Sequence, residues 1–201
     1  MAPGILLLNP ITDNRGNFTM SYLNELVPMP PASSINGGIS PCPTNLLVKR
    51  HGMPRAKLTD ECAAVTSIYW GGRMVTKDVG PFRVTGFDIA VEMLASSLAV
   101  VRQKQPTLYG ALGTAGMLCC RHVRGVPGLL SNHALGMAID FKIDGMLDPR
   151  GDGKVQRGLI DLYGVMKGFG WFWGVEFRIE DGMHFEIGAE VIRQWINQGR
   201  L

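Results

Sequence analysis

The stretch SNHALGMAIDFKI, residues 131–143, combines a histidine, a glycine and a strand-like alternation. In its second half, AIDFKI at 138–143, apolar side chains alternate with Asp140 and Lys142. Because successive side chains of a strand point to opposite faces, this pattern predicts a β-strand with one apolar and one polar face. Asp140 is expected on the polar face.

A second stretch, MHFEI at 183–187, shows the same alternation, with His184 and Glu186 between apolar residues. It predicts another short strand with one apolar face and one face that carries chemistry. The polar side chains of the two strands could therefore converge if the strands share a sheet.

Three segments have helical periodicity: residues 86–103, 155–168 and 190–198. In the first, the positions that recur at helical spacing are Phe87, Val91, Leu94, Leu98 and Val101. Together with the two strands, these segments predict an α+β fold in which helices flank a small antiparallel sheet.

Residues 1–45 differ from the rest of the chain in composition and in periodicity. They are rich in proline and show no sustained period, yet they contain too many apolar residues for a plain linker. We therefore predict an irregular N-terminal arm at 1–45, which docks on the domain or on a partner, and one folded domain at 46–201.

The composition excludes some classes of function. With 201 residues and 46% apolar content, the chain can bury a real core, and 20 basic against 17 acidic residues form no basic stripe for nucleic acid. No apolar run approaches the roughly 18 residues of a membrane helix. The start, MAPGILLLNP, lacks the features of a signal peptide, which predicts synthesis in the cytoplasm without a leader.

Four cysteines, Cys42, Cys62, Cys119 and Cys120, match no CxxC metal spacing and no dense disulfide framework. We expect reduced thiols. A thiol nucleophile at Cys119 or Cys120 with His122 is disfavoured, because such pairs usually assemble from distant segments.

A metal site is the main chemical hypothesis. His133, Asp140 and His184 offer two imidazoles and one carboxylate, a set typical of a catalytic zinc that keeps a fourth position for water. Seven residues separate His133 from Asp140, so an unbroken strand would place them on opposite faces. Gly136 supplies the conformational freedom for a bend between them.

Asp181 precedes His184 by three residues in EDGMHFEI. A metal lowers the pKa of bound water toward about 7, and a nearby carboxylate can accept the proton as that water attacks a carbonyl. The combination indicates amide hydrolysis.

Each of these residues also has an ordinary structural explanation. A single histidine among apolar residues is most often structural or merely exposed, and Asp140 can cap or pair at the end of a sheet. The residues alone therefore leave a metal site and a purely structural role open.

The motifs resemble those of a known family. SNHALGMAID is similar to the SxHxxGxAxD signature of the zinc D-Ala-D-Ala carboxypeptidases and the phage L-alanyl-D-glutamate endolysin peptidases, and DGMHFE is similar to their downstream (E/D)xxH element. The resemblance covers residues 113–188 closely, is loose over 46–112 and does not extend to the arm. It implies the hedgehog/DD-peptidase fold.

By position, the resemblance implies that His133, Asp140 and His184 bind Zn²⁺ and that Asp181 is the catalytic carboxylate. Many members of the family have glutamate at that place, while the endolysin branch accepts aspartate.

Other polar residues near the motifs have less certain roles. Glu180 and Glu186 are alternative bases, and Glu186 could instead orient His184, since the two share a face. Arg121 resembles the family arginine that binds substrate or stabilises the oxyanion, or it is a surface arginine. Ser131 is either a turn residue or a hydroxyl that supports the site.

The expected function is a zinc metallopeptidase that hydrolyses an amide bond of the peptidoglycan stem peptide, as an endopeptidase or a carboxypeptidase. The resemblance to phage proteins implies a lysis enzyme or a virion component, with the arm contacting other virion proteins, that acts at the cell wall or periplasm. The alternative is a non-catalytic zinc-containing module, structural or wall-binding, of the same fold.

Two further patterns receive structural interpretations. LDPRGDGKVQRGLID at 147–161 resembles a calcium loop, but Arg150 and Leu159 stand where ligands are needed, so a glycine-rich turn is expected. The aromatic residues Trp171, Phe172 and Trp173 are expected to pack in the core with one ring exposed.

Overall fold

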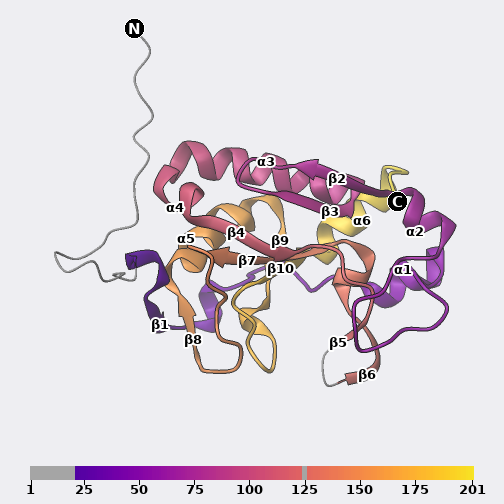
Figure 1. Cartoon of the computed structure of the whole chain (residues 1–201), viewed down its shortest axis with the longest axis horizontal. Coiled ribbons are helices and arrows are strands. Elements are labelled where there is room, and N and C mark those ends of the chain that lie inside the picture. Colours follow the sequence, from indigo (N-terminus) through magenta and orange to yellow (C-terminus); the bar gives the residue numbers. More distant parts are fainter. Residues whose placement is uncertain (1–20, 124–125) are drawn as a thin grey trace, which may run out of the picture.

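The computed structural model describes residues 21–123 and 126–201. At its centre is a four-stranded antiparallel sheet in the order β4-β7-β10-β9 (Figure 1). Its strands are β4 (Leu112–Gly116), β7 (Ala138–Ile143), β9 (Trp171–Trp173) and β10 (His184–Ile187). The prediction of an α+β fold with a small antiparallel sheet is confirmed.

The two predicted strands are β7 and β10, and they are neighbours. Their register places His184 opposite Asp140 and Phe185 opposite Ile139. Because directly paired residues point to the same face, this register brings the polar side chains of both strands together. The apolar residues of the opposite face, Ile139, Phe141, Ile143, Phe185 and Ile187, are fully buried.

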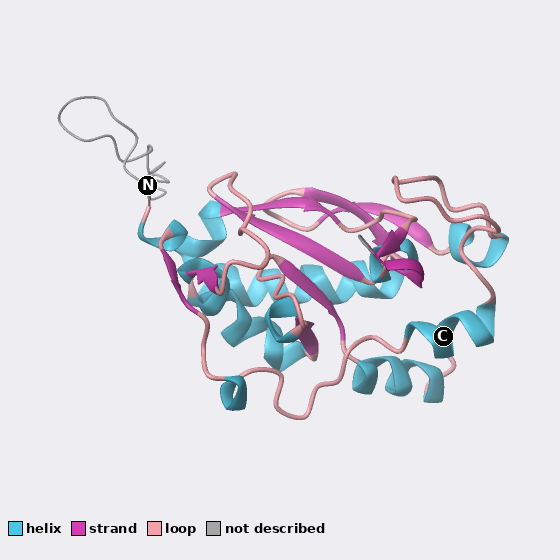
Figure 2. Cartoon of the chain, turned by 90° about the horizontal axis from the view of Figure 1, so that it is seen from below, coloured by secondary structure: helices cyan, strands magenta, loops and turns pink. Residues whose placement is uncertain are grey.

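The helices lie along one side of this sheet and at one end of it (Figure 1, Figure 2). They are α1 (Thr44–His51), α2 (Ile68–Gly72), α3 (Asp88–Lys104), α4 (Pro106–Ala111), α5 (Arg157–Met166) and α6 (Ala189–Asn197). No helix within the described ranges has both the length and the apolar character needed to cross a membrane.

All three predicted helices are present. α3 is central, and the five residues predicted to form its apolar face are completely buried, although Phe87 ends β3 and the helix begins at Asp88. α5 is shorter than the predicted 155–168, because residues 154–156 pair with another strand instead of starting the helix. α6 begins one residue before the predicted 190–198 and ends one residue earlier.

Three two-stranded ladders surround the central sheet. They pair β1 (Leu26–Pro28) with β8 (Lys154–Gln156), β2 (Met74–Asp78) with β3 (Arg83–Phe87), and β5 (His122–Val123) with β6 (Val126–Leu130). The β5–β6 hairpin projects from the body of the molecule beside the sheet (Figure 1). Its place matters for the site because Arg121 and Ser131 flank it.

The aromatic strand β9 lies in the core. Trp171 and Trp173 are fully buried and Phe172 is 3% exposed. Trp171 Nε1 donates to Ser97 Oγ of α3 at 3.1 Å. Core packing was predicted correctly, whereas the prediction of one exposed ring is wrong, because both faces of this edge strand are covered.

Residues 21–45 run along the domain, while residues 1–20 of the predicted arm lie outside the described residues. The side chain of Asn36 donates to Trp173 O and accepts from Trp173 N, both at 2.9 Å. The backbone N–H of Cys42 donates to Glu186 Oε1 at 2.8 Å. This segment therefore reaches the polar face of β10.

The prediction that all four cysteines are reduced is wrong for Cys62 and Cys119, which form a disulfide with a Cα–Cα distance of 4.9 Å. The partners are 57 residues apart in sequence. Spacing along the chain could not reveal the contact, because it arises where the loop before α2 folds against the segment that follows β4. Cys42 and Cys120 are free and buried.

Replacing both Cys62 and Cys119 by serine is expected to lower the free energy of unfolding by about 4 kcal/mol, since the bridge closes a long loop and restricts the unfolded chain. Urea denaturation with and without a reducing agent measures the effect. The reducing agent should destabilise the wild type and leave the double variant unchanged. A wild type that is equally stable in both conditions would contradict the prediction.

Candidate metal centre

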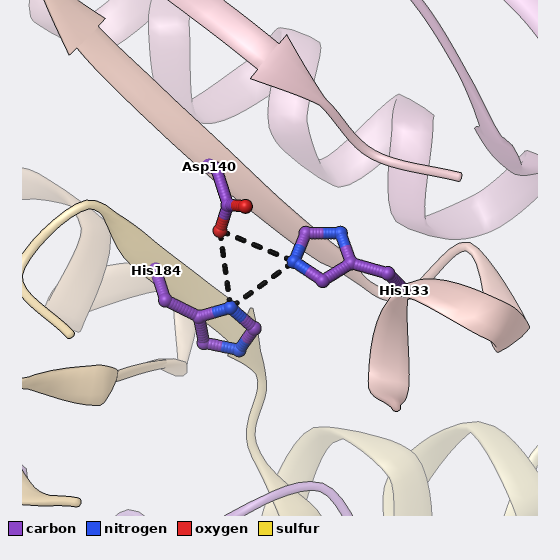
Figure 3. Close-up of side chains that lie close together, drawn as sticks. All are labelled: His133, Asp140 and His184. Carbon is purple, nitrogen blue, oxygen red and sulfur yellow. Dashed lines mark hydrogen bonds and ion pairs between the residues drawn. The ribbon is translucent and has the colours of Figure 1, made fainter. Parts of the chain in front are cut away.

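Three of the predicted residues meet at one point, on the polar face of β7 and β10 (Figure 3). His133 Nε2, Asp140 Oδ1 and His184 Nδ1 lie 3.1 Å from one another in all three pairs. Among the residues that the structure describes, theirs is the one group of three or more histidine, cysteine or acidic side chains with ligand atoms all within 4.8 Å.

A tight turn brings His133 back toward Asp140. Residues Asn132–Leu135 form a single 3-10 turn that ends at Gly136, whose φ of 61° is left-handed. A Cβ at Gly136 would lie 2.6 Å from the backbone nitrogen of Phe87, so no larger residue fits. The bend predicted between His133 and Asp140 is present at this glycine.

Hydrogen bonds fix the orientation of both imidazole rings. His133 Nδ1 lies 3.2 Å from Met117 O, and since a carbonyl only accepts, this nitrogen is the donor. His184 Nε2 donates to Glu186 Oε2 at 2.9 Å. Each ring is thus left with its other nitrogen directed at the cluster, which is the arrangement that metal-binding histidines adopt.

Glu186 accepts several of the hydrogen bonds that hold the side chains around His184 in place. It is 1% exposed. Besides His184, it accepts hydrogen bonds from Cys42 N at 2.8 Å and from Asn132 Nδ2 at 2.5 Å. Both carboxylate oxygens are therefore engaged, and Glu186 is placed to orient His184.

Two opposing effects set the pKa values in the cluster: burial disfavours charged side chains, and attraction between opposite charges favours them. Burial opposes ionisation of Asp140, but His133 and His184 outweigh it and hold the pKa of Asp140 well below its usual range. Burial likewise opposes protonation of His184, but hydrogen bonds to Asp140 and Glu186 raise its pKa from 6.5 to about 10. The cluster strongly favours a positive charge at its centre.

The donor set fits a zinc ion. Two imidazole nitrogens whose partner nitrogens already donate, together with one carboxylate oxygen, face each other and can offer three electron pairs to a shared cation. Tetrahedral zinc with bonds near 2.0–2.1 Å spaces its ligands about 3.3 Å apart, close to the distances within the cluster. His133, Asp140 and His184 could therefore hold Zn²⁺ with little rearrangement.

The cluster opens into a cleft of about 710 Å³. One wall comes from the β5–β6 hairpin and the other from the segment before β10, both of which extend beyond the sheet on the same side (Figure 1). Apolar side chains dominate the walls: Val123, Val126, Leu129, Leu130, Phe177, Ile179 and Met183. Three arginines also line it: Arg121, Arg150 and Arg178.

Asp181 lines the same cleft. Its Oδ2 lies 3.5 Å from Arg150 Nε, and its Oδ1 is buried without a hydrogen-bond partner among the described residues. Burial raises the pKa of Asp181 above its ordinary value, and the charge of Asp140 adds to the effect, while His184 and Arg150 oppose it. A carboxylate with a raised pKa at the lining of the cleft suits proton transfer.

Glu180, the other alternative base, is not among the residues that line the cleft. Its Oε1 accepts a hydrogen bond from Gly153 N at 2.6 Å. Glu180 therefore anchors the loop before β8, although it is the direct neighbour of Asp181.

Arg121 and Ser131 both line the cleft beside His133. Arg121 Nη1 donates to His122 O at 2.8 Å, and Arg121 O accepts from Ser131 N at 3.2 Å. Ser131 is the residue before the 3-10 turn, and its side chain does not cap that turn.

Sequence reasoning missed the position of Arg150. This residue was noted only because it stands where a calcium ligand is needed, yet it lies in the cleft beside Asp181. The glycine-rich turn itself was predicted correctly, since Gly151 and Gly153 have φ values of 82° and 74°. No sequence signal connects this turn to Asp181, because the contact depends on the fold.

Comparison with known proteins points to the same segment of the chain. Residues 124–187 match the D-alanyl-D-alanine carboxypeptidase family. The matched region contains His133, Asp140, Asp181 and His184, and it agrees with the resemblance of the two motifs. No curated protein matches the chain.

Proposed function

We propose that the chain is a zinc-dependent peptidoglycan peptidase that hydrolyses an amide bond of the stem peptide, with water as nucleophile. The observation that carries the proposal is the triangle of three ligand atoms, each 3.1 Å from the other two, at a cleft that Asp181 also lines. The family match over residues 124–187 supports the same chemistry.

Each group of residues has a separate role in the proposed hydrolysis. His133, Asp140 and His184 would hold a zinc ion, which would supply Lewis-acid chemistry that polarises a carbonyl and lowers the pKa of water. Asp181 accepts the proton that the attacking water loses and returns it to the leaving amine. Arg121 provides positive charge in the cleft for the oxygen that becomes negative.

The cleft suits the proposed substrate class. Its apolar walls accommodate small apolar side chains, while Arg121 and Arg178 add positive charge that attracts carboxylates. Stem peptides combine both features, because they contain alanine residues and free carboxyl groups.

The disulfide supports action outside a reducing compartment. Disulfides persist in secreted and periplasmic proteins and at virion surfaces. The bond between Cys62 and Cys119 is thus consistent with work at the cell wall or in the periplasm. We propose a phage lysis enzyme or virion component on the resemblance of its motifs, testable by probing purified particles for the protein.

A zymogram on purified peptidoglycan tests the proposed activity. The protein should clear the wall layer, a chelator should abolish clearing and added zinc should restore it. The mass of the released fragments separates an endopeptidase from a carboxypeptidase. Clearing that is insensitive to the chelator contradicts the proposal, and a zinc-loaded protein that binds the wall without clearing it supports the non-catalytic alternative.

A further inference from the structure

Arg150 lines the cleft but has no role in the proposed hydrolysis so far. It is in the glycine-rich turn between β7 and β8, and its Nε is 3.5 Å from Asp181 Oδ2. This ion pair joins the candidate base to a part of the chain that neither motif includes.

The turn that carries Arg150 is held firmly against the segment of Asp181. Gly153 N donates to Glu180 Oε1 at 2.6 Å. On the other side of Asp181, a Cβ at Gly182 would lie 2.3 Å from Asp148 Oδ2, so the side chain of Asp148 packs directly against the backbone of Gly182. These contacts flank Asp181 on both sides, so the backbone of Arg150 has a defined position relative to that carboxylate.

The two oxygens of Asp181 have different surroundings. Oδ2 faces Arg150, whereas Oδ1 is buried and has no hydrogen-bond partner within the described part of the chain. We propose that Arg150 is a positioning residue for Asp181: its ion pair with Oδ2 fixes the rotation of the carboxylate that accepts the proton. This inference rests on the proposed function, because it assigns a task within the same hydrolysis.

The expected consequence is on rate and not on stability. The side chains of Arg150 and Asp181 are 37% and 22% exposed, and ion pairs near the surface contribute little to folding. Orientation of a general base, by contrast, affects the rate of chemistry strongly. The planar guanidinium also defines direction in a way that a lysine ammonium cannot.

Kinetics on a soluble stem peptide test the assignment. Arg150→Gln should lower kcat about tenfold and leave KM within about twofold, and Arg150→Lys should recover part of the loss. Combined with Asp181→Asn, Arg150→Gln should cause no further loss, since the residue acts through Asp181. Lys154→Gln, which removes the same charge from outside the cleft lining, is the matched control and should behave as the wild type.

An unchanged kcat in Arg150→Gln overturns the inference. So does a further tenfold loss on top of Asp181→Asn, because it would mean that Arg150 acts independently of Asp181. An inactive wild type refutes the proposed function instead.

A second measurement needs no activity. In NMR spectra of the metal-free chain, the Nε–H signal of Arg150, assigned by its loss in Arg150→Lys, should shift in Asp181→Asn and stay in place in Asp152→Asn. A signal that Asp181→Asn leaves in place overturns the inference, whatever the chain hydrolyses.

Discussion

Replacing Asp181 by asparagine is expected to lower the rate of amide hydrolysis by about 10²- to 10⁴-fold while leaving zinc binding intact. Asparagine keeps the size of the side chain but cannot accept a proton from water at neutral pH. Asp181 is also outside the group of ligand atoms that lie within 4.8 Å of one another. Turnover of a soluble stem peptide and the zinc content of the purified variant measure the two effects separately.

Glu180→Gln is the matched control for this variant. It removes one carboxylate from the adjacent position, yet its amide oxygen can still accept from Gly153 N. We expect activity close to that of the wild type. If Glu180→Gln were inactive and Asp181→Asn active, the assignment of the base would be reversed.

Replacing His184 by alanine is expected to abolish both stoichiometric zinc binding and hydrolysis. Only two of the three ligands would remain, and the buried Glu186 would lose the ring that it orients. Elemental analysis of protein purified without chelators measures the zinc, and a thermal unfolding curve shows whether the variant is folded.

A milder change at the same site should have a graded effect. Glu186→Gln keeps all three ligands and is expected to weaken zinc binding by about 10- to 100-fold, because the acceptor for His184 Nε2–H is no longer charged. His122→Ala removes a histidine outside the cluster and should retain one zinc per chain. Full zinc content in His184→Ala would show that the metal, if any, is bound elsewhere.

Local pattern was sufficient for the main elements of the fold. The alternation in residues 138–143 and 183–187 predicts β7 and β10, and helical spacing predicts α3, α5 and α6. These predictions succeed because burial of one face imposes a period of 2 or 3.6 on the residues themselves. The boundary of α5 was missed, since residues 154–156 are drawn into a ladder with β1, which is distant in sequence.

The candidate metal ligands were also within reach of the sequence. His133, Gly136 and Asp140 are local to one another, and a left-handed glycine is the feature that a bend between them requires. The third ligand, His184, is the first residue of β10, whose polar face was evident from its alternation. What remained open was whether the two segments meet.

The amino-acid sequence by itself therefore determined which residues are candidates for chemistry and which face of each strand they occupy. Only the tertiary structure decided that His184 pairs with Asp140, that Cys62 reaches Cys119, and that Arg150 faces Asp181. The physical reason is the same in all three cases. These contacts join segments far apart in the chain, so they depend on strand register and loop packing. Neither can be read from the pattern of residues within one segment.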